Sequence, residues 1–159
     1  MHDKHSKQTI LVPVDFSPYS EISLLKACEI AACMNLSVVV LHVVHDPSQM
    51  PGYYSKMRKK KHLVRIEDVA KEMLDEFMEK MAASHTELKC LAEAESLLVM
   101  GLPVGRILEV AERINAVMIV MGSQGRTGLE HVLLGSKAEQ VVRLSPVSVT
   151  IVKANKSHQ

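Results

Sequence analysis

The candidate chemistry of this sequence is concentrated between Val117 and Ser136, in the segment VMIVMGSQGRTGLEHVLLGS. Gly122 and Gly125 follow a short apolar run, and they allow backbone conformations that a Cβ would penalise. Successive N–H groups can therefore converge on one anion. Gly135 and Ser136 precede a helical pattern, and the first N–H groups of a helix attract negative charge. Together, the two groups of donors could hold a polyphosphate.

The same residues also have a purely structural interpretation. Ser136 and Glu139 have the spacing of a capping box, so Ser136 could serve only to cap its helix. Gly122 and Gly125 could serve only to form a tight turn. Glycine loops alone do not decide between phosphate binding and turn formation, so both interpretations stay open at this point.

Asp15 is the second candidate, because it directly follows the first apolar run of the chain. A carboxylate at the carboxyl end of a first strand can accept hydrogen bonds from an adenine amino group or a ribose hydroxyl. Alternatively, it supports the turn into the next helix and the positive end of that helix. Ser17 is a suitable N-cap and Pro18 a suitable first residue for a helix at this place.

Runs rich in β-branched residues alternate with stretches whose apolar residues recur at helical spacing. These patterns predict strands at 9–14, 37–45, 90–100, 117–121 and 147–152, and helices at 18–34, 62–83, 103–114 and 136–144. Glu93 and Glu95 interrupt the third strand, which suits an edge strand facing water. The irregular segment 46–61 is a candidate lid, and its basic run, 58–61, is either a contact for phosphates, lipids or a partner, or a solvated surface.

Five alternations of strand and helix predict an α/β fold, a single-domain, doubly wound parallel sheet with helices on both faces. Ligands bind such sheets where the strand order reverses. In the order 3-2-1-4-5 this point lies between the first and fourth strands, where Asp15 and Gly122 would meet. We expect one domain over 9–153, between flexible tails at 1–8 and 154–159.

The glycine pattern resembles that of a known family. Gly122, Gly125, Gly135 and Ser136 form G-x2-G-x9-G-S, which is similar to the ATP-binding signature of the universal stress protein A family. Three further segments resemble core elements of the same family, in the same order: ILVPVDFSP (Ile10–Pro18), LHVV (Leu41–Val44) and SPVSVTIVK (Ser145–Lys153).

The resemblance implies a Rossmann-like, ATP-binding stress-response module whose conformation or partner binding is set by the bound nucleotide. Asp15 would contact the nucleotide, and Val43 would pack against adenine. The backbone of residues 122–126, the Gly135 and Ser136 amides and the Ser136 hydroxyl would hold the phosphates. The full expected site is Pro13, Val14, Asp15, Val43, Met121, Gly122, Ser123, Gln124, Gly125, Arg126, Gly135 and Ser136.

Some details of this expected site depart from the family pattern or depend on the ligand. Mg²⁺ could bridge phosphate oxygens, because the sequence has no carboxylate cluster for a dedicated cage. Arg126 could add positive charge, or it could be an ordinary exposed arginine. Gln124 replaces a common histidine and Val14 a common threonine. Both replacements affect individual side-chain contacts and leave the backbone donors intact.

We do not expect efficient catalysis. The loop region offers no base or nucleophile with a partner, and His131 has no evident role there. At most, slow ATP hydrolysis or autophosphorylation is expected. One alternative is an adenylating enzyme, although such enzymes place their glycines after the first strand, where this chain reads VDFSPYS. Another is a nucleotide-free structural dimer, against which the intact glycine pattern argues.

Composition limits the partners. The formal net charge of +1 and a pI near 7.8 favour no nucleic-acid surface. No run is long enough to span a membrane and the start MHDKHSKQT lacks a leader's apolar core, so we expect a cytoplasmic protein.

The three cysteines lack C-x-x-C spacing and are expected to be reduced and mostly buried. The apolar strand 147–152 predicts a homodimer through this edge, while the sequence leaves the protein partner and the triggering stress unspecified.

Overall fold

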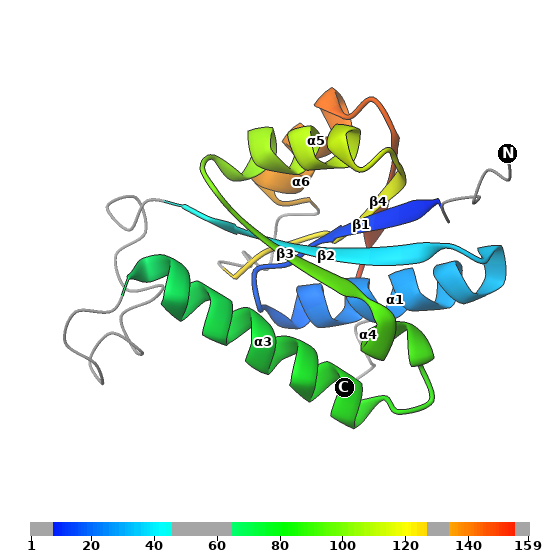
Figure 1. Ribbon diagram of the computed structural model, residues 1–159. Helices are drawn as coiled ribbons and strands as arrows, with labels where there is room; N and C mark the ends of the chain where they lie inside the picture. Colours follow the sequence, from blue (N-terminus) through cyan, green and yellow to red (C-terminus); the bar gives the residue numbers. More distant parts are fainter. Residues whose placement is uncertain (1–7, 46–64, 127–133, 155–159) are drawn as a thin grey trace, which may run out of the picture.

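Five parallel strands form one sheet in the order β3-β2-β1-β4-β5, which confirms the predicted topology. The computed structural model describes residues 8–45, 65–126 and 134–154 (Figure 1). The predictions for the segment 46–61 and for His131 concern residues outside these ranges. The strands are β1 (Thr9–Pro13), β2 (Ser37–Val44), β3 (Glu95–Met100), β4 (Ala116–Gly122) and β5 (Ser148–Val152).

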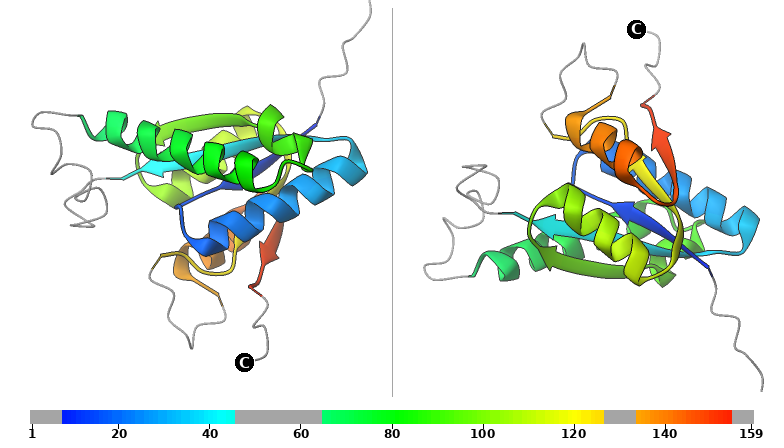
Figure 2. Two further views of the ribbon diagram at one scale, coloured as in Figure 1. Left: turned by 90° about the horizontal axis from the view of Figure 1, so that it is seen from below. Right: turned by 90° about the horizontal axis from the view of Figure 1, so that it is seen from above.

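Helices cover both faces of the sheet, as predicted. They are α1 (Pro18–Met34), α3 (Ile66–Ser84), α4 (Lys89–Glu93), α5 (Pro103–Arg113) and α6 (Ser136–Leu144). Seen from below, α1 and α3 lie in front of the sheet, and seen from above, α5 and α6 do (Figure 2). None of the helices in the described part of the chain combines the length and the apolar character needed to cross a bilayer.

Strands β1 and β2 are buried on both faces because each face of the sheet packs against helices. Ile10 and Val12 of β1 contribute to a core with α1 and α3, whereas Leu11 between them contributes to a core with α5 and α6. This alternation follows the two-residue period of a strand. It explains why β1 and β2 are nearly continuous apolar runs.

Helix α1 begins and ends at the predicted residues. The Ser17 hydroxyl accepts a hydrogen bond from the Ser20 N–H at 3.3 Å, and Pro18 is the first helical residue. Asn35 ends the helix in the left-handed conformation, with φ of 55°. These local signals fix where α1 starts, directly after Asp15.

The prediction of one strand from Cys90 to Met100 is wrong in its first half. Residues 89–93 form the short helix α4, and β3 begins only at Glu95. Leu91 is buried in the core formed with α1 and α3, and a helical turn places it there while Glu93 stays exposed. β3 is an edge strand with an exposed Glu95, as expected.

Candidate functional site

A cavity of about 180 Å³ lies at the carboxyl ends of β1 and β4, where the strand order reverses. The two strands are neighbours in the sheet, so the loops that follow them meet at the same edge. Every residue of the expected site except Ser123 lines this cavity: Pro13, Val14, Asp15, Val43, Met121, Gly122, Gln124, Gly125, Arg126, Gly135 and Ser136. Residues far apart in the sequence are thus brought together.

Ser123 is buried and braces the loop instead of lining the cavity. Its N–H donates to the Val152 carbonyl at 2.9 Å, and its carbonyl accepts from the Gly135 N–H at 2.7 Å. The expectation that the Ser123 and Gly135 amides face a phosphate is therefore wrong for this conformation. Both amides are engaged in holding the loop after β4 against β5 and the start of α6.

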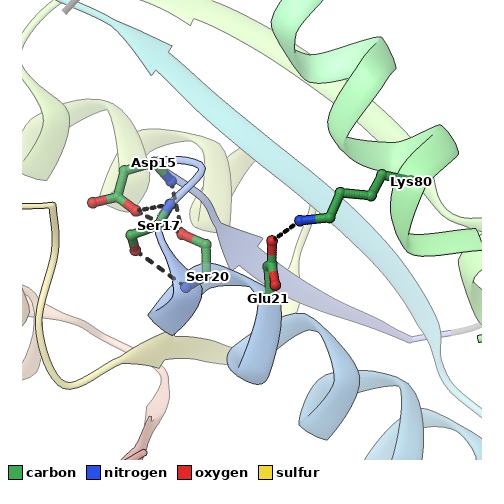
Figure 3. Close-up of polar contacts among 5 residues, drawn as sticks. All are labelled: Asp15, Ser17, Ser20, Glu21 and Lys80. Atoms are coloured by element: carbon green, nitrogen blue, oxygen red, sulfur yellow. Dashed lines mark hydrogen bonds and ion pairs between the residues drawn. The ribbon is translucent and has the colours of Figure 1, made fainter. Parts of the chain in front are cut away.

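The Asp15 carboxylate sits in a network of hydrogen bonds at the start of α1 (Figure 3). Its Oδ1 accepts from the Ser17 N–H at 3.1 Å and from the Ser20 hydroxyl at 2.8 Å. Its Oδ2 accepts from the Arg126 N–H at 3.1 Å. The structural interpretation of Asp15 is correct, and the same carboxylate also lines the cavity.

An ion pair just beyond this network joins α1 to α3. Lys80 Nζ lies 2.5 Å from Glu21 Oε1, one turn into α1 (Figure 3). The lysine is largely exposed, so the pair contributes at most about 1 kcal/mol to stability. Neither Lys80 nor Glu21 lines the cavity.

Gly122 and Gly125 are needed because other atoms approach them closely. A Cβ at Gly122 would lie 2.7 Å from the Tyr19 Cβ, and one at Gly125 would lie 2.8 Å from Asp15 Oδ2. The predicted reason was unusual backbone dihedrals, but neither glycine has a positive φ in the range that side chains avoid. The glycines therefore allow α1 and Asp15 to approach the loop after β4.

Helix α6 begins one residue earlier than a capping box would require. Gly135 is the N-cap, and its carbonyl accepts from the Glu139 N–H at 2.9 Å. Ser136 is the first helical residue, and the cap has no side-chain hydrogen bond, so the capping-box prediction is wrong.

Within 8–45, 65–126 and 134–154, the N–H groups of Gly125 and Ser136 have no backbone hydrogen-bond partner, and both residues line the cavity.

Lys137 is a cavity residue that the sequence analysis did not identify. It lies in the first turn of α6, beside Ser136, and Arg126 lies on the loop across the cavity. A lysine near a helix N-terminus is electrostatically unfavourable for the helix alone, because the dipole is positive there. This unfavourable placement is a signal in the sequence that could have identified Lys137.

The inner wall of the cavity is apolar. Val14, Val43 and Met121 were expected there, and all three are buried. The sequence analysis missed four further apolar lining residues, which come from β2, α5 and α6: Leu41, Pro103, Ile107 and Ala138. An apolar inner wall and a polar rim suit a ligand that has an apolar ring system and a charged tail.

His42 also lines the cavity and was expected to be a packed, hydrogen-bonded histidine. It is 2% exposed, and its Nδ1 lies 2.9 Å from the Val14 carbonyl oxygen. Its ring centroid is 4.3 Å from that of Phe16. Burial lowers the pKa of His42 from 6.5 to about 4, so the ring is neutral at pH 7 and donates its Nδ1 proton to Val14. His42 thereby positions the end of β1.

The described residues offer no dedicated metal cage, since no three His, Cys, Asp or Glu side chains group together in that part of the chain. That Mg²⁺ bridges phosphate oxygens stays a prediction.

Comparison with known proteins identifies the family. The universal stress protein family matches residues 7–153. Universal stress protein A homolog 1 of Coxiella burnetii is 33% identical over 153 residues, which cover 96% of this chain and 97% of the relative.

Two solved structures share the fold and contain nucleotides. A universal stress protein in complex with cAMP is 26% identical, with a TM-score of 0.61, over 92% of this chain and 97% of that one. The universal stress protein from Archaeoglobus fulgidus in complex with dAMP is 26% identical, with a TM-score of 0.61, over 92% and 98%. The chain therefore belongs to the universal stress protein family.

Proposed function

We propose that this stress-response protein binds ATP in the cavity between β1 and β4, and that the bound nucleotide sets its conformation or its choice of partner. The observation that carries the proposal is the composition of the cavity, which combines a buried apolar wall with a rim of backbone amides and two basic side chains. The cAMP and dAMP complexes of similar proteins support the nucleotide class.

In this proposal the apolar wall receives the adenine ring. Val14, Val43 and Met121 offer buried apolar surface, and Asp15 lies beside them as a hydrogen-bond acceptor. Because Asp15 already accepts from the Arg126 N–H, a ribose hydroxyl or adenine amino group would share or replace that bond. Binding therefore involves the loop after β4 directly.

The phosphates are placed at the rim, near the start of α6. The Gly125 and Ser136 amides and the Ser136 hydroxyl are the proposed donors, since the Ser123 and Gly135 amides are already bonded. Arg126 and Lys137 add two positive charges to the positive end of the α6 dipole. Mg²⁺ would be held by the phosphate oxygens.

The enclosed volume limits how ATP can fit. The cavity of about 180 Å³ is smaller than the ~300–1,000 Å³ usual for ligand pockets. It therefore suits the base and sugar, while the phosphates extend over the open rim. Alternatively, the wall residues move outward on binding, and a change of this kind would transmit occupancy to a partner protein.

We propose binding rather than efficient catalysis. Two titratable groups of the site have structural tasks, because Asp15 holds the turn into α1 and His42 donates to the Val14 carbonyl. At most, slow hydrolysis or autophosphorylation is expected. Product analysis after prolonged incubation with Mg-ATP tests this point, and rapid turnover would favour the alternative of an ATP-hydrolysing or adenylating enzyme.

A thermal melt with and without Mg-ATP tests nucleotide binding. Ligand at 100 times its dissociation constant should stabilise the fold by about 2.7 kcal/mol, which corresponds to several degrees in a domain of this size. Titration with ADP, AMP and cAMP in parallel would show how many phosphates the rim recognises. No shift with any of these nucleotides at millimolar concentration would overturn the proposal.

We also propose a homodimer through β5. This strand is the sheet edge opposite β3, and its Val149 and Ile151 pack against the core with α5 and α6. Antiparallel pairing with a second copy would satisfy the outward-facing backbone groups of the edge. Light scattering at micromolar concentration should give the mass of two chains. A cytoplasmic location stays a prediction.

A further inference from the structure

Two cysteines that are far apart in the sequence meet at a second cavity. Cys28 Sγ of α1 lies 2.8 Å from Cys90 Sγ of α4. Cys28 is fully buried, whereas Cys90 is partly exposed and Cys33 is exposed, so the expectation of mostly buried cysteines is wrong. The two sulfur atoms are thus within about 1 Å of the ~2.0 Å length of an S–S bond. The two thiols therefore need little movement to react with one another.

This second cavity, of about 420 Å³, lies at the amino end of β2, whereas the proposed nucleotide site lies at the carboxyl ends of the strands. It is lined by both cysteines and by Ser37 and Val38, which begin β2, whereas residues 41–43 further along β2 line the first cavity. The two cavities share no lining residue. A small oxidant could therefore reach the thiols without entering the nucleotide site.

We propose that Cys28 and Cys90 form a redox-sensitive dithiol that a hydroperoxide converts to an intramolecular disulfide, clamping α4 to α1. The Cys90 thiolate attacks the peroxide and forms a sulfenic acid, and the departing oxygen takes up the proton that the Cys90 thiol released on ionisation, so that water or an alcohol leaves. Cys28 then attacks the sulfenic sulfur, and its thiol proton leaves with the hydroxyl as water. Two thiols lose two electrons, and one peroxide bond is reduced.

The surroundings of the two thiols support this division of roles. The hydrogen bond from the Cys28 thiol lowers the pKa of Cys90, against the opposing effects of burial and of Glu93. The same hydrogen bond, with burial, raises the pKa of Cys28. Because the thiolate is the nucleophile, the partly exposed Cys90 reacts first and the buried Cys28 resolves the sulfenic acid.

The proposal does not depend on nucleotide binding, so the two can fail separately. The test treats the full chain with a slight excess of hydrogen peroxide and then maps peptides under non-reducing conditions. We expect a Cys28–Cys90 cross-link, a mass lower by two hydrogens, and full reversal by dithiothreitol. The disulfide would close a loop across 62 sequence positions, so the Tm should rise by about 5–15 °C.

Cys33 provides a matched control, because it is an exposed thiol on the same helix. Cys33→Ser should form the cross-link as the parent does. Cys28→Ser should instead leave a sulfenic acid on Cys90 that dimedone traps, and Cys90→Ser should not be labelled at Cys28. The peptide map of the parent chain tests the cross-link without any substitution, so this test does not depend on whether a variant folds. A map with both thiols intact after peroxide, or with Cys33 in the cross-link, would overturn the proposal.

Discussion

The Asp15 carboxylate accepts a hydrogen bond from the Arg126 N–H at 3.1 Å, across 111 sequence positions. This bond joins the loop after β1 to the loop after β4 at the point where the strand order reverses. In the proposed function, a nucleotide bound between these loops would share this hydrogen bond or replace it.

Asp15→Asn should weaken both the fold and nucleotide binding. The Asp15 carboxylate now accepts hydrogen bonds from Ser17, Ser20 and Arg126. The asparagine amide retains one oxygen but presents its NH₂ group to at least one of these three donors. We expect a loss of roughly 1–3 kcal/mol in unfolding free energy and at least a tenfold weaker affinity for ATP. Chemical denaturation and calorimetric titration measure the two effects.

Asp75→Asn is the control for this substitution, because Asp75 is an exposed residue whose ion pair with Lys71 lies on the surface of α3. It should change stability by less than about 1 kcal/mol and leave affinity unchanged. Equal ATP affinity in the two variants would remove Asp15 from the proposed site.

Gly125→Ala should reduce nucleotide binding by moving the Asp15 carboxylate or the loop. The new methyl group would lie 2.8 Å from Asp15 Oδ2, too close to be accepted without displacement. We expect an affinity for ATP lower by about tenfold or more, since the displaced carboxylate and the Gly125 N–H are both proposed contacts. Isothermal titration calorimetry gives the dissociation constants.

Gly105→Ala is its matched control. Gly105 lies inside α5, and a Cβ there would meet no atom within 4 Å. Because alanine is a better helix former than glycine, this variant should be about 0.5–1 kcal/mol more stable than the parent. It should bind ATP as the parent does. Equal binding by both glycine variants would contradict the placement of the nucleotide beside Gly125.

Lys137→Gln should discriminate between nucleotides by their phosphate content. Lys137 lies in the first turn of α6, where the proposal places the phosphates. Charge-assisted hydrogen bonds contribute about 1.5–3 kcal/mol, so ATP affinity should fall about tenfold or more while AMP affinity falls less. Lys153→Gln, which removes an exposed charge just after β5, should change neither. An equal loss for ATP and AMP would place Lys137 away from the outer phosphates.

The sequence predicted those parts of the fold that depend on signals in the local sequence, such as helix caps and hydrophobic periodicity. Helix α1 has strong signals at both ends, Ser17 with Pro18 and then Asn35, and its predicted bounds match the structure. The parallel sheet with helices on both faces followed from the alternation of elements and from the handedness of their connections, whereas the order 3-2-1-4-5 was assumed and is confirmed by the structure. The same reasoning brought Asp15 and Gly122 to one edge of the sheet.

The errors arose where tertiary contacts outweigh local signals. Residues 90–93 are apolar enough for a strand, but burial of Leu91 against the core favours a helical turn. Ser136 has a suitable spacing for a cap, but the Gly135 carbonyl begins the helix one residue earlier. Ser123 lies between the two glycines, but its bonds to Val152 and Gly135 depend on distant elements. No local pattern contains this information.

His42 makes the stability of this protein depend on pH. Burial lowers its pKa in the folded state to about 4 from the ordinary 6.5. Between these values the unfolded chain binds a proton that the folded chain does not, so its contribution to stability is complete above pH 6.5 and is lost as pH falls toward 4. The loss should approach about 1.4 kcal/mol per pH unit within this window and total about 3 kcal/mol.

His42→Asn tests this dependence, because asparagine can still donate to the Val14 carbonyl but does not titrate. It should be less stable than the parent at pH 7.5, having lost the ring contact with Phe16, yet lose less stability between pH 6.5 and 4.5. His85→Asn removes a more exposed histidine at the end of α3 and should retain the parent's slope. Parallel slopes in all three proteins would show that the buried His42 ring does not carry the pH dependence.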